Sequence, residues 1–262
     1  MLKRELKINL KSFIVWEAII LGLLLVVYLV YPSIANSENI KLMDEMIKIF
    51  PEEVIKMFNM DIATMDTAFG WLKSEGFVMI LLIIGCYSGI LGSTILSKEE
   101  SDKTIEYLNS LPVKRSNIVM SKVISGVTYI IFMVLSIGIF NYIGLELSGD
   151  FDKLEFLMLS ISPLFAAIPL FFISMFISTL LKSKKVVGIG LGIAMISYVL
   201  NTLSGLSSNV EFLKYFSVFT LSDIRNIILS DSVNGIMIII SFIISIVFLI
   251  GIIYKYNRKE LI

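Results

Sequence analysis

The feature that most constrains this chain is a series of six apolar runs, each long enough to cross a bilayer as a helix. About 20 apolar residues are needed to span roughly 30 Å of hydrocarbon. The runs do not alternate apolar and polar positions, as the strands of a membrane barrel do. With 56% hydrophobic residues, the chain is predicted to be an all-α integral membrane protein with a single domain over 1–262. The expected spans lie near 13–31, 77–96, 122–146, 154–181, 186–206 and 235–254.

The basic residues are divided unevenly between the two sides of these spans. Most of them lie in the first segment, in the loop between the second and third spans, in the link at 182–185 and in the C-terminal segment. The positive-inside rule places that side, with both termini, in the cytoplasm. A signal peptide cleaved near Ser33–Ala35 is the alternative. The first apolar run is longer than an ordinary signal core, so the first span is expected to be retained.

Residue types exclude several kinds of chemistry. The chain has no histidine and one cysteine, Cys86, inside an apolar run, so neither a Cys/His metal site nor a histidine-based triad is possible. Cys86 is predicted to be a small buried hydrophobe. No G-x-x-x-x-G-K-[ST] phosphate loop is present. The spans also lack the clustered charged residues of an ion-driven transporter.

Residues 96–122, LSKEESDKTIEYLNSLPVKRSNIVMSK, interrupt the apolar sequence between the second and third spans. Pro112 ends a short helix predicted over 104–109. Because a plain connection needs only a few residues, a folded loop suggests docking. The residues that would share the exposed apolar face and meet a partner are Ile105, Tyr107, Leu108 and Leu111. The alternative is a solvated connector whose apolar residues rest on the membrane surface.

This loop resembles the first cytoplasmic loop of ABC-2-type permeases, the membrane subunits of bacterial ABC exporters. The residues that match the family pattern are Glu99, Glu100, Thr104, Glu106, Leu108, Leu111, Pro112, Val113, Arg115 and Lys122. Lys103 stands where the family usually has Gly, so the turn before the helix is expected to differ. Two further segments, 49–72 and 213–231, resemble the outer regions before the second and last spans of such permeases, although Val218 replaces a frequent Pro.

The resemblance implies a role for the loop. In ABC-2 permeases the short loop helix is a coupling helix, seated in a groove of a separate ATPase subunit. ATP and Mg²⁺ then belong to that partner, and this chain is expected to hold no cofactor or metal and to catalyse no reaction. Expected partners are two ATPase subunits, a second permease that is identical or related, the bilayer and the cargo, with no nucleic acid. The residues assigned to coupling are Glu99, Glu100, Thr104, Ile105, Glu106, Tyr107, Leu108, Leu111, Pro112 and Arg115.

The expected function is ATP-driven export of an amphipathic or hydrophobic cargo. A peptide is favoured, by resemblance to small permeases that export antimicrobial peptides and peptide toxins or confer immunity to them. Small drugs and lipid-linked molecules are alternatives, and a non-transporting scaffold or immunity protein would keep the same fold. A membrane enzyme is disfavoured, because the spans hold no histidine and no paired aspartates.

Glycines within the spans suggest how the helices pack. The pairs Gly85/Gly89 and Gly188/Gly192 have the spacing that lets helix backbones approach closely. The contact lies either within one subunit or at a seam between two permeases, for which Gly85 and Gly89 are the first candidates.

Prolines and one carboxylate also stand out within the spans. Pro163 and Pro169 are expected to bend the fourth span. Glu17 lies about one turn inside the first span and is expected to extend to the interface or to pair with a nearby basic residue.

The segments on the opposite side of the membrane carry amphipathic patterns. Two helices are predicted within 37–75, either lying at the membrane interface or forming an exit surface for cargo. Before the last span, four aromatic residues are predicted to form an interfacial belt or a short re-entrant outer gate. These residues are Phe212, Tyr215, Phe216 and Phe219.

Overall fold

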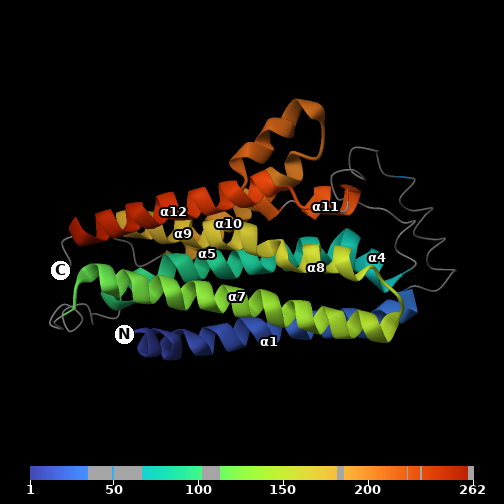
Figure 1. Ribbon diagram of the computed structural model, residues 1–262, viewed down its shortest axis with the longest axis horizontal. Coiled ribbons are helices and arrows are strands. Elements are labelled where there is room, and N and C mark those ends of the chain that lie inside the picture. The colour runs from blue at the N-terminus through green and yellow to red at the C-terminus, as the bar shows by residue number, and fades with distance from the viewer. Residues whose placement is uncertain are drawn as a thin grey trace.

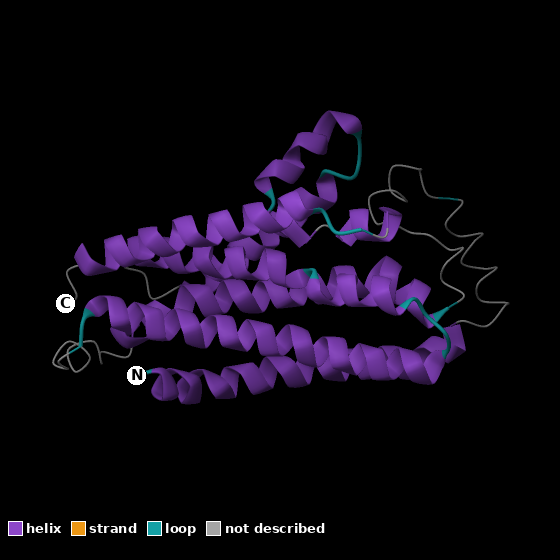
Figure 2. Cartoon of the chain, in the orientation of Figure 1, coloured by secondary structure: helices purple, strands orange, loops and turns teal. Residues whose placement is uncertain are grey.

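The computed structural model of the chain describes residues 1–34, 49, 67–101, 113–181, 186–222, 224–230 and 232–258. These residues form helices joined by short loops, and none of them lies in a strand (Figure 2). Six helical stretches are long and apolar enough to cross a membrane, which confirms the predicted all-α membrane fold. In chain order the elements are α1 (Leu2–Ile34), α4 (Ala68–Trp71), η2 (Leu72–Gly76), α5 (Phe77–Ser101), α7 (Arg115–Ser148), α8 (Lys153–Ile161), α9 (Pro163–Leu180), α10 (Val186–Leu203), η3 (Ser208–Phe216), η4 (Val218–Ser222), α11 (Ile224–Ser230) and α12 (Gly235–Arg258).

Two of the spanning helices begin well before their apolar runs. α1 starts at Leu2 rather than near 13, and α7 starts at Arg115 rather than near 122. In both helices the additional turns carry charged residues and lie at the end of the bundle that holds both termini, which we call the termini end (Figure 1). Hydropathy marks only the part of a helix that matches the hydrocarbon, so it misses polar turns that continue the same helix.

The fourth predicted span consists of two helices, α8 and α9, which meet at Ser162. Pro163 occupies the first position of α9, where a backbone N–H would lack a partner within the helix, so proline is tolerated there. The side chain of Asp152 caps α8 by accepting hydrogen bonds from the backbone of Leu154 and Glu155. Pro163 therefore begins a helix, whereas Pro169 lies inside one.

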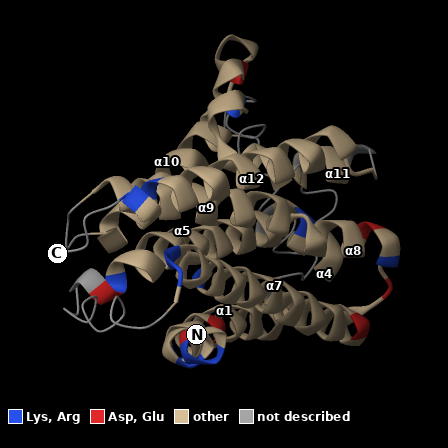
Figure 3. Ribbon diagram, turned by 60° about the vertical axis from the view of Figure 1, so that its left-hand side comes forward, with Lys and Arg blue, Asp and Glu red and all other residues tan. Residues whose placement is uncertain are grey.

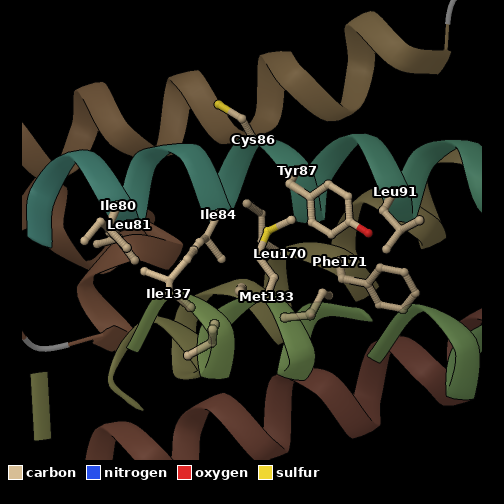
Figure 4. Close-up of a cluster of buried hydrophobic side chains, with 14 of the residues drawn as sticks. Ile80, Leu81, Ile84, Cys86, Tyr87, Leu91, Met133, Ile137, Leu170 and Phe171 are labelled. Carbon is tan, nitrogen blue, oxygen red and sulfur yellow. The ribbon is translucent and has the colours of Figure 1, made fainter. Parts of the chain in front are cut away.

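The helices form a bundle with α1 at one edge and α5 and α9 in its middle (Figure 1). α5 packs against α9 and α10, and α12 packs against α9. Figure 4 shows the buried core where α5 faces α7 and α9. Its side chains include Ile84, Tyr87, Met133, Leu170 and Phe171, all of which are buried. Because α5 packs against α7, α9 and α10, a displacement of α5 would also change its contacts with these three spans.

α1 and α7 run side by side in the same direction and keep a nearly constant register. Glu5 contacts Lys122 toward one end and Tyr28 contacts Asn141 toward the other, at sequence separations of 117 and 113. Most of the remaining surface of α1 is apolar and exposed in the isolated chain, which suits contact with lipid. α1 is therefore held to the bundle along one face.

Candidate coupling site

At the termini end, Lys122 is buried where three helices meet. Its Nζ atom lies 3.2 Å from Glu5 Oε2 in α1 and 2.5 Å from Glu99 Oε1 in α5. The same ammonium donates to the backbone carbonyl of Ile95 at 2.7 Å, and only 1% of the lysine side chain is exposed. We call Glu5, Glu99 and Lys122 the ion triad. It joins the start of α1, the last turns of α5 and the beginning of α7.

The ion triad does not balance its charges. Two carboxylates share one ammonium, and Glu5 Oε1 and Glu99 Oε2 are buried without a hydrogen-bond partner. An intact buried ion pair adds little net stability because desolvation offsets the attraction, but removing one partner typically costs about 3–5 kcal/mol. The triad therefore fixes where the three helix ends lie, because they can separate only by leaving buried charge unpaired.

Figure 3 marks the charged residues on the ribbon, and most of them lie toward the ends of the helices. Within the described residues, no three His, Cys, Asp or Glu side chains are placed to bind a metal ion. The ion triad is accordingly a contact between helices, with its one cation supplied by the chain itself.

A second contact ties the other side of the predicted coupling loop to the last helix. Arg115 begins α7, and its Nη1 atom donates to the backbone carbonyl of Asn257 near the end of α12, at 3.4 Å. The helix before residues 102–112 is thus tied to α1 and α7 through Glu99. The helix after them is tied to α12 through Arg115.

Among the residues predicted to contact an ATPase, the structure describes the side chains of Glu99 and Arg115. Glu100 lies in the last turn of α5, with its side chain outside the described part. The coupling role of all ten residues stays a prediction. Seven of them lie outside the described ranges: Thr104, Ile105, Glu106, Tyr107, Leu108, Leu111 and Pro112.

Glu5 is the site residue that the sequence analysis did not identify. It is 2% exposed although it stands in a strongly basic segment. Asn9, one turn further on, is also buried and donates to the carbonyl of Glu5 at 3.0 Å. A carboxylate and an amide four residues apart on one side of a lysine-rich helix is the signal that marks a buried polar face here.

Gly85 and Gly89 are buried within the chain. A Cβ atom on Gly85 would collide with the ring of Phe219, and one on Gly89 would collide with the carbonyl oxygen of Gly190 in α10. These contacts lie within one chain, and the seam between two permeases stays a prediction. The absence of side chains lets the backbones of α5 and α10 touch. Gly192, in contrast, has open space where its Cβ would be.

The four aromatic residues of the predicted outer gate divide into two groups. Phe219 in η4 is 2% exposed and packs against Gly85 and the ring of Tyr198. Phe212, Tyr215 and Phe216 in η3 are 55%, 78% and 71% exposed. Figure 1 shows the segment that follows α10 projecting from the side of the bundle above α12. Phe219 therefore anchors this segment, and the other three line its surface.

Ser197 of α10 binds the residues at which this segment re-enters the bundle. The hydroxyl of Ser217 donates to the carbonyl of Ser197 at 2.6 Å, and the backbone N–H of Val218 donates to the Ser197 hydroxyl at 2.7 Å. The chain thus leaves α10, turns through η3 and re-enters at η4. Whether the exposed aromatic residues act as a belt or a gate stays a prediction.

Six apolar helices with both termini at one end define a multi-pass membrane protein, and the two helices that flank residues 102–112 are bound to each other and to α1 and α12. The family model described as "ABC-2 family transporter protein" matches residues 1–261, and the chain belongs to this family. No curated protein and no solved structure matches the chain. It is accordingly a permease subunit of an ABC transporter, located in the plasma membrane and partnered by an ABC ATPase.

Proposed function

We propose that this permease exports an amphipathic cargo, most favourably a peptide, and that residues 102–112 transmit ATPase motion into it from the cytoplasm. The observation that carries the proposal is that both helices flanking this loop are bound to further helices. Before the loop, Glu99 connects the end of α5 to α7 and, through Lys122, to α1. After the loop, Arg115 connects the start of α7 to α12. A partner that moves the loop therefore also moves α5 and α7, together with the helices bound to them.

The ion pair beside the loop supports this transmission of motion. The contact between Lys122 and Glu99 is short and buried, so the ends of α5 and α7 cannot slide apart without exposing or stranding a charge. α5 and α7 are each a continuous hydrogen-bonded helix, so displacement at one end is carried along it. ATP and Mg²⁺ belong to the ATPase subunit, of which two copies act with two permeases.

The chemistry of the helices supports an apolar or amphipathic cargo. The buried side chains of α5, α7 and α9 are largely aliphatic and aromatic, with scattered serines. Charge within the apolar part of a span is expensive and marks ion pathways where it clusters. A peptide with an apolar face suits such surroundings better than a small hydrated ion does.

The loop is tested by a double variant. Ile105→Asp with Leu108→Asp is expected to abolish co-purification of the ATPase subunit while the permease still inserts. The matched control is Leu147→Asp with Leu154→Asp, which places two carboxylates on exposed leucines at the opposite end of the bundle. Co-purification that survives the loop variant would refute the role of the loop, and an equal loss in the control would count against it too.

The direction and the cargo class are tested by transport. Inside-out vesicles that hold the permease and its ATPase are expected to accumulate an amphipathic peptide in the presence of ATP. A non-transporting scaffold or immunity protein would show the same assembly without accumulation, and this result would refute export.

A further inference from the structure

Glu17 is a carboxylate that the coupling contacts do not use. It lies twelve residues beyond Glu5 on α1, about 18 Å further along the helix axis, within the apolar part of the span. The Ser136 hydroxyl of α7 donates to Glu17 Oε1 at 2.5 Å, and Glu17 Oε2 is buried without a hydrogen-bond partner. The sequence predicts that Glu17 extends to the interface or pairs with a basic residue; among the described residues no ion pair involves it, and its partner is Ser136.

A second unpartnered polar group lies at the same level. Tyr87 of α5 is 1% exposed, and its hydroxyl has no hydrogen-bond partner. The ring centroids of Tyr87 and Trp16, the neighbour of Glu17, lie 6.0 Å apart. Tyr129 of α7 packs against Phe13, one turn before Glu17, with 4.9 Å between the ring centroids. Tyr129 is already engaged, because its hydroxyl donates to the backbone carbonyl of Leu6 at 2.5 Å.

The chemistry of these two orphan atoms indicates what would satisfy them. A carboxylate oxygen and a phenol oxygen both accept hydrogen bonds, and an ammonium group offers three N–H donors together with a positive charge. A carboxylate within hydrocarbon is costly unless an opposite charge accompanies it. A water molecule would supply donors but would leave the charge uncompensated.

We propose that Glu17, Ser136 and Tyr87 form an intramembrane site for the ammonium group of an amphipathic molecule. Glu17 and Ser136 are both partly exposed, so the site is reachable from the surface where α1 meets α7. The apolar tail would lie on the exposed apolar side chains of α1. Only the identity of this molecule as a cationic cargo rests on the proposed function; the site does not depend on it.

Trp16 provides a direct readout of occupancy. The chain has two tryptophans, and Trp71→Phe leaves Trp16 as the single fluorophore beside the site. The full chain is placed in phosphatidylcholine vesicles, and two quenchers of equal length are compared. One is a bromoalkylammonium with its bromine close to the nitrogen, and the other is the matching bromoalkanol. At equal amounts in the bilayer, the ammonium is expected to quench at a concentration roughly tenfold lower, because hydrogen bonds to charged groups are the stronger ones.

Variants assign the preference to the carboxylate. Glu17→Gln keeps the size of the side chain and is expected to abolish the difference between the two quenchers, with quenching by the alcohol unchanged. Tyr87→Phe is expected to reduce the difference, and Glu17→Asp to retain part of it. Glu146→Gln, which removes an exposed carboxylate at the opposite end, is the matched control and should retain the full preference. The proposal is overturned if the parent chain shows no preference for the ammonium, or if the preference survives Glu17→Gln.

Phosphatidylethanolamine distinguishes the two sources of an ammonium group. If adding this lipid to the vesicles removes the preferential quenching, the site holds a lipid ammonium. If quenching persists, the site selects a separate cationic molecule. Both results support the ammonium site, and neither needs an ATPase, so a failure of the export proposal leaves this test intact.

Discussion

Lys122 of α7 and Glu99 of α5 form a buried ion pair, with 2.5 Å between Nζ and Oε1, beside the point where α5 ends and the polar loop begins. Through the same lysine, Glu5 joins the pair from α1. The position of the loop is therefore coupled to helices that are distant in the sequence. Any rearrangement of the loop must either preserve this contact or carry the energetic cost of breaking it.

Lys122→Met is expected to destabilise the permease by about 3–5 kcal/mol, because it leaves two carboxylates buried without a cation. Adding Glu5→Gln and Glu99→Gln should recover most of the loss, because no buried charge then remains. Thermal or denaturant unfolding in detergent measures both effects. Lys153→Met is the control, since Lys153 and Glu146 form an exposed pair at 2.7 Å that contributes little to stability. Equal losses in the two lysine variants would contradict the importance of burial.

Gly89→Ala is expected to destabilise the contact between α5 and α10 by about 1–3 kcal/mol, because its Cβ would meet the backbone oxygen of Gly190, which cannot rotate away. Gly192→Ala is the matched substitution on an open face. It should be neutral or stabilising by up to about 1 kcal/mol, through helix propensity alone. Unfolding curves of both variants check the difference, and a tolerated Gly89→Ala would mean that the two helices are not in backbone contact.

Phe219→Ala is expected to cost about 3–5 kcal/mol, because it opens a cavity between α5 and α10. Phe216→Ala, at an exposed position, should leave stability nearly unchanged. If the η3 aromatic residues act as an outer gate, Phe216→Ala should alter cargo transport without altering unfolding. A stability loss shared equally by the two variants would argue against the anchor role of Phe219.

The pH dependence of η3 follows from one exposed pair. The hydrogen bond from Lys214, together with its charge, holds the pKa of Glu211 below its ordinary value. The folded form therefore gains stability at pH above the ordinary carboxyl pKa, and loses it as pH falls through the lowered one. The effect should be small because the pair is exposed, and Glu211→Gln should remove it. Amide hydrogen exchange of η3 as a function of acid pH measures it; an unchanged profile in the variant would contradict the assignment.

The sidedness of the membrane is testable with thiol labelling. Cys86 is buried and is the chain's one cysteine, so Cys86→Ser gives a background without thiols. In it, Asn109→Cys should react with an impermeant maleimide from the cytoplasmic side alone, and Leu147→Cys from the outside alone. Outside labelling at 109 would invert the predicted orientation.

The class of fold could be predicted because the hydrocarbon sets a minimum length for each apolar run. The full extent of α1 and α7 could not, because their first turns are charged and lie outside the apolar window. The break at Ser162 also escaped prediction as a break, since proline at a first helical position looks the same in sequence as proline inside a helix.

The ion triad shows the limit of reading charges along a chain. Glu5, Glu99 and Lys122 are each visible in the sequence, but the partners stand 117 and 23 positions apart. Only the lateral order of the helices brings them together. The exposed and buried aromatic residues before α12 could not be separated either, because they lie in two short helices interrupted at Ser217, so no single period runs through all four.

The parallel pairing of α1 with α7 has a consequence for biosynthesis. At about 5–20 residues added per second, the ribosome needs roughly 6–23 s to pass from Glu5 to Lys122, which lies 117 positions later. Throughout that interval the newly inserted first helix has neither Lys122 nor Ser136 for its carboxylates. Translation that stalls before α7 is made would leave α1 in the membrane with its carboxylates unpaired. Quality-control proteases could distinguish this form from the finished subunit.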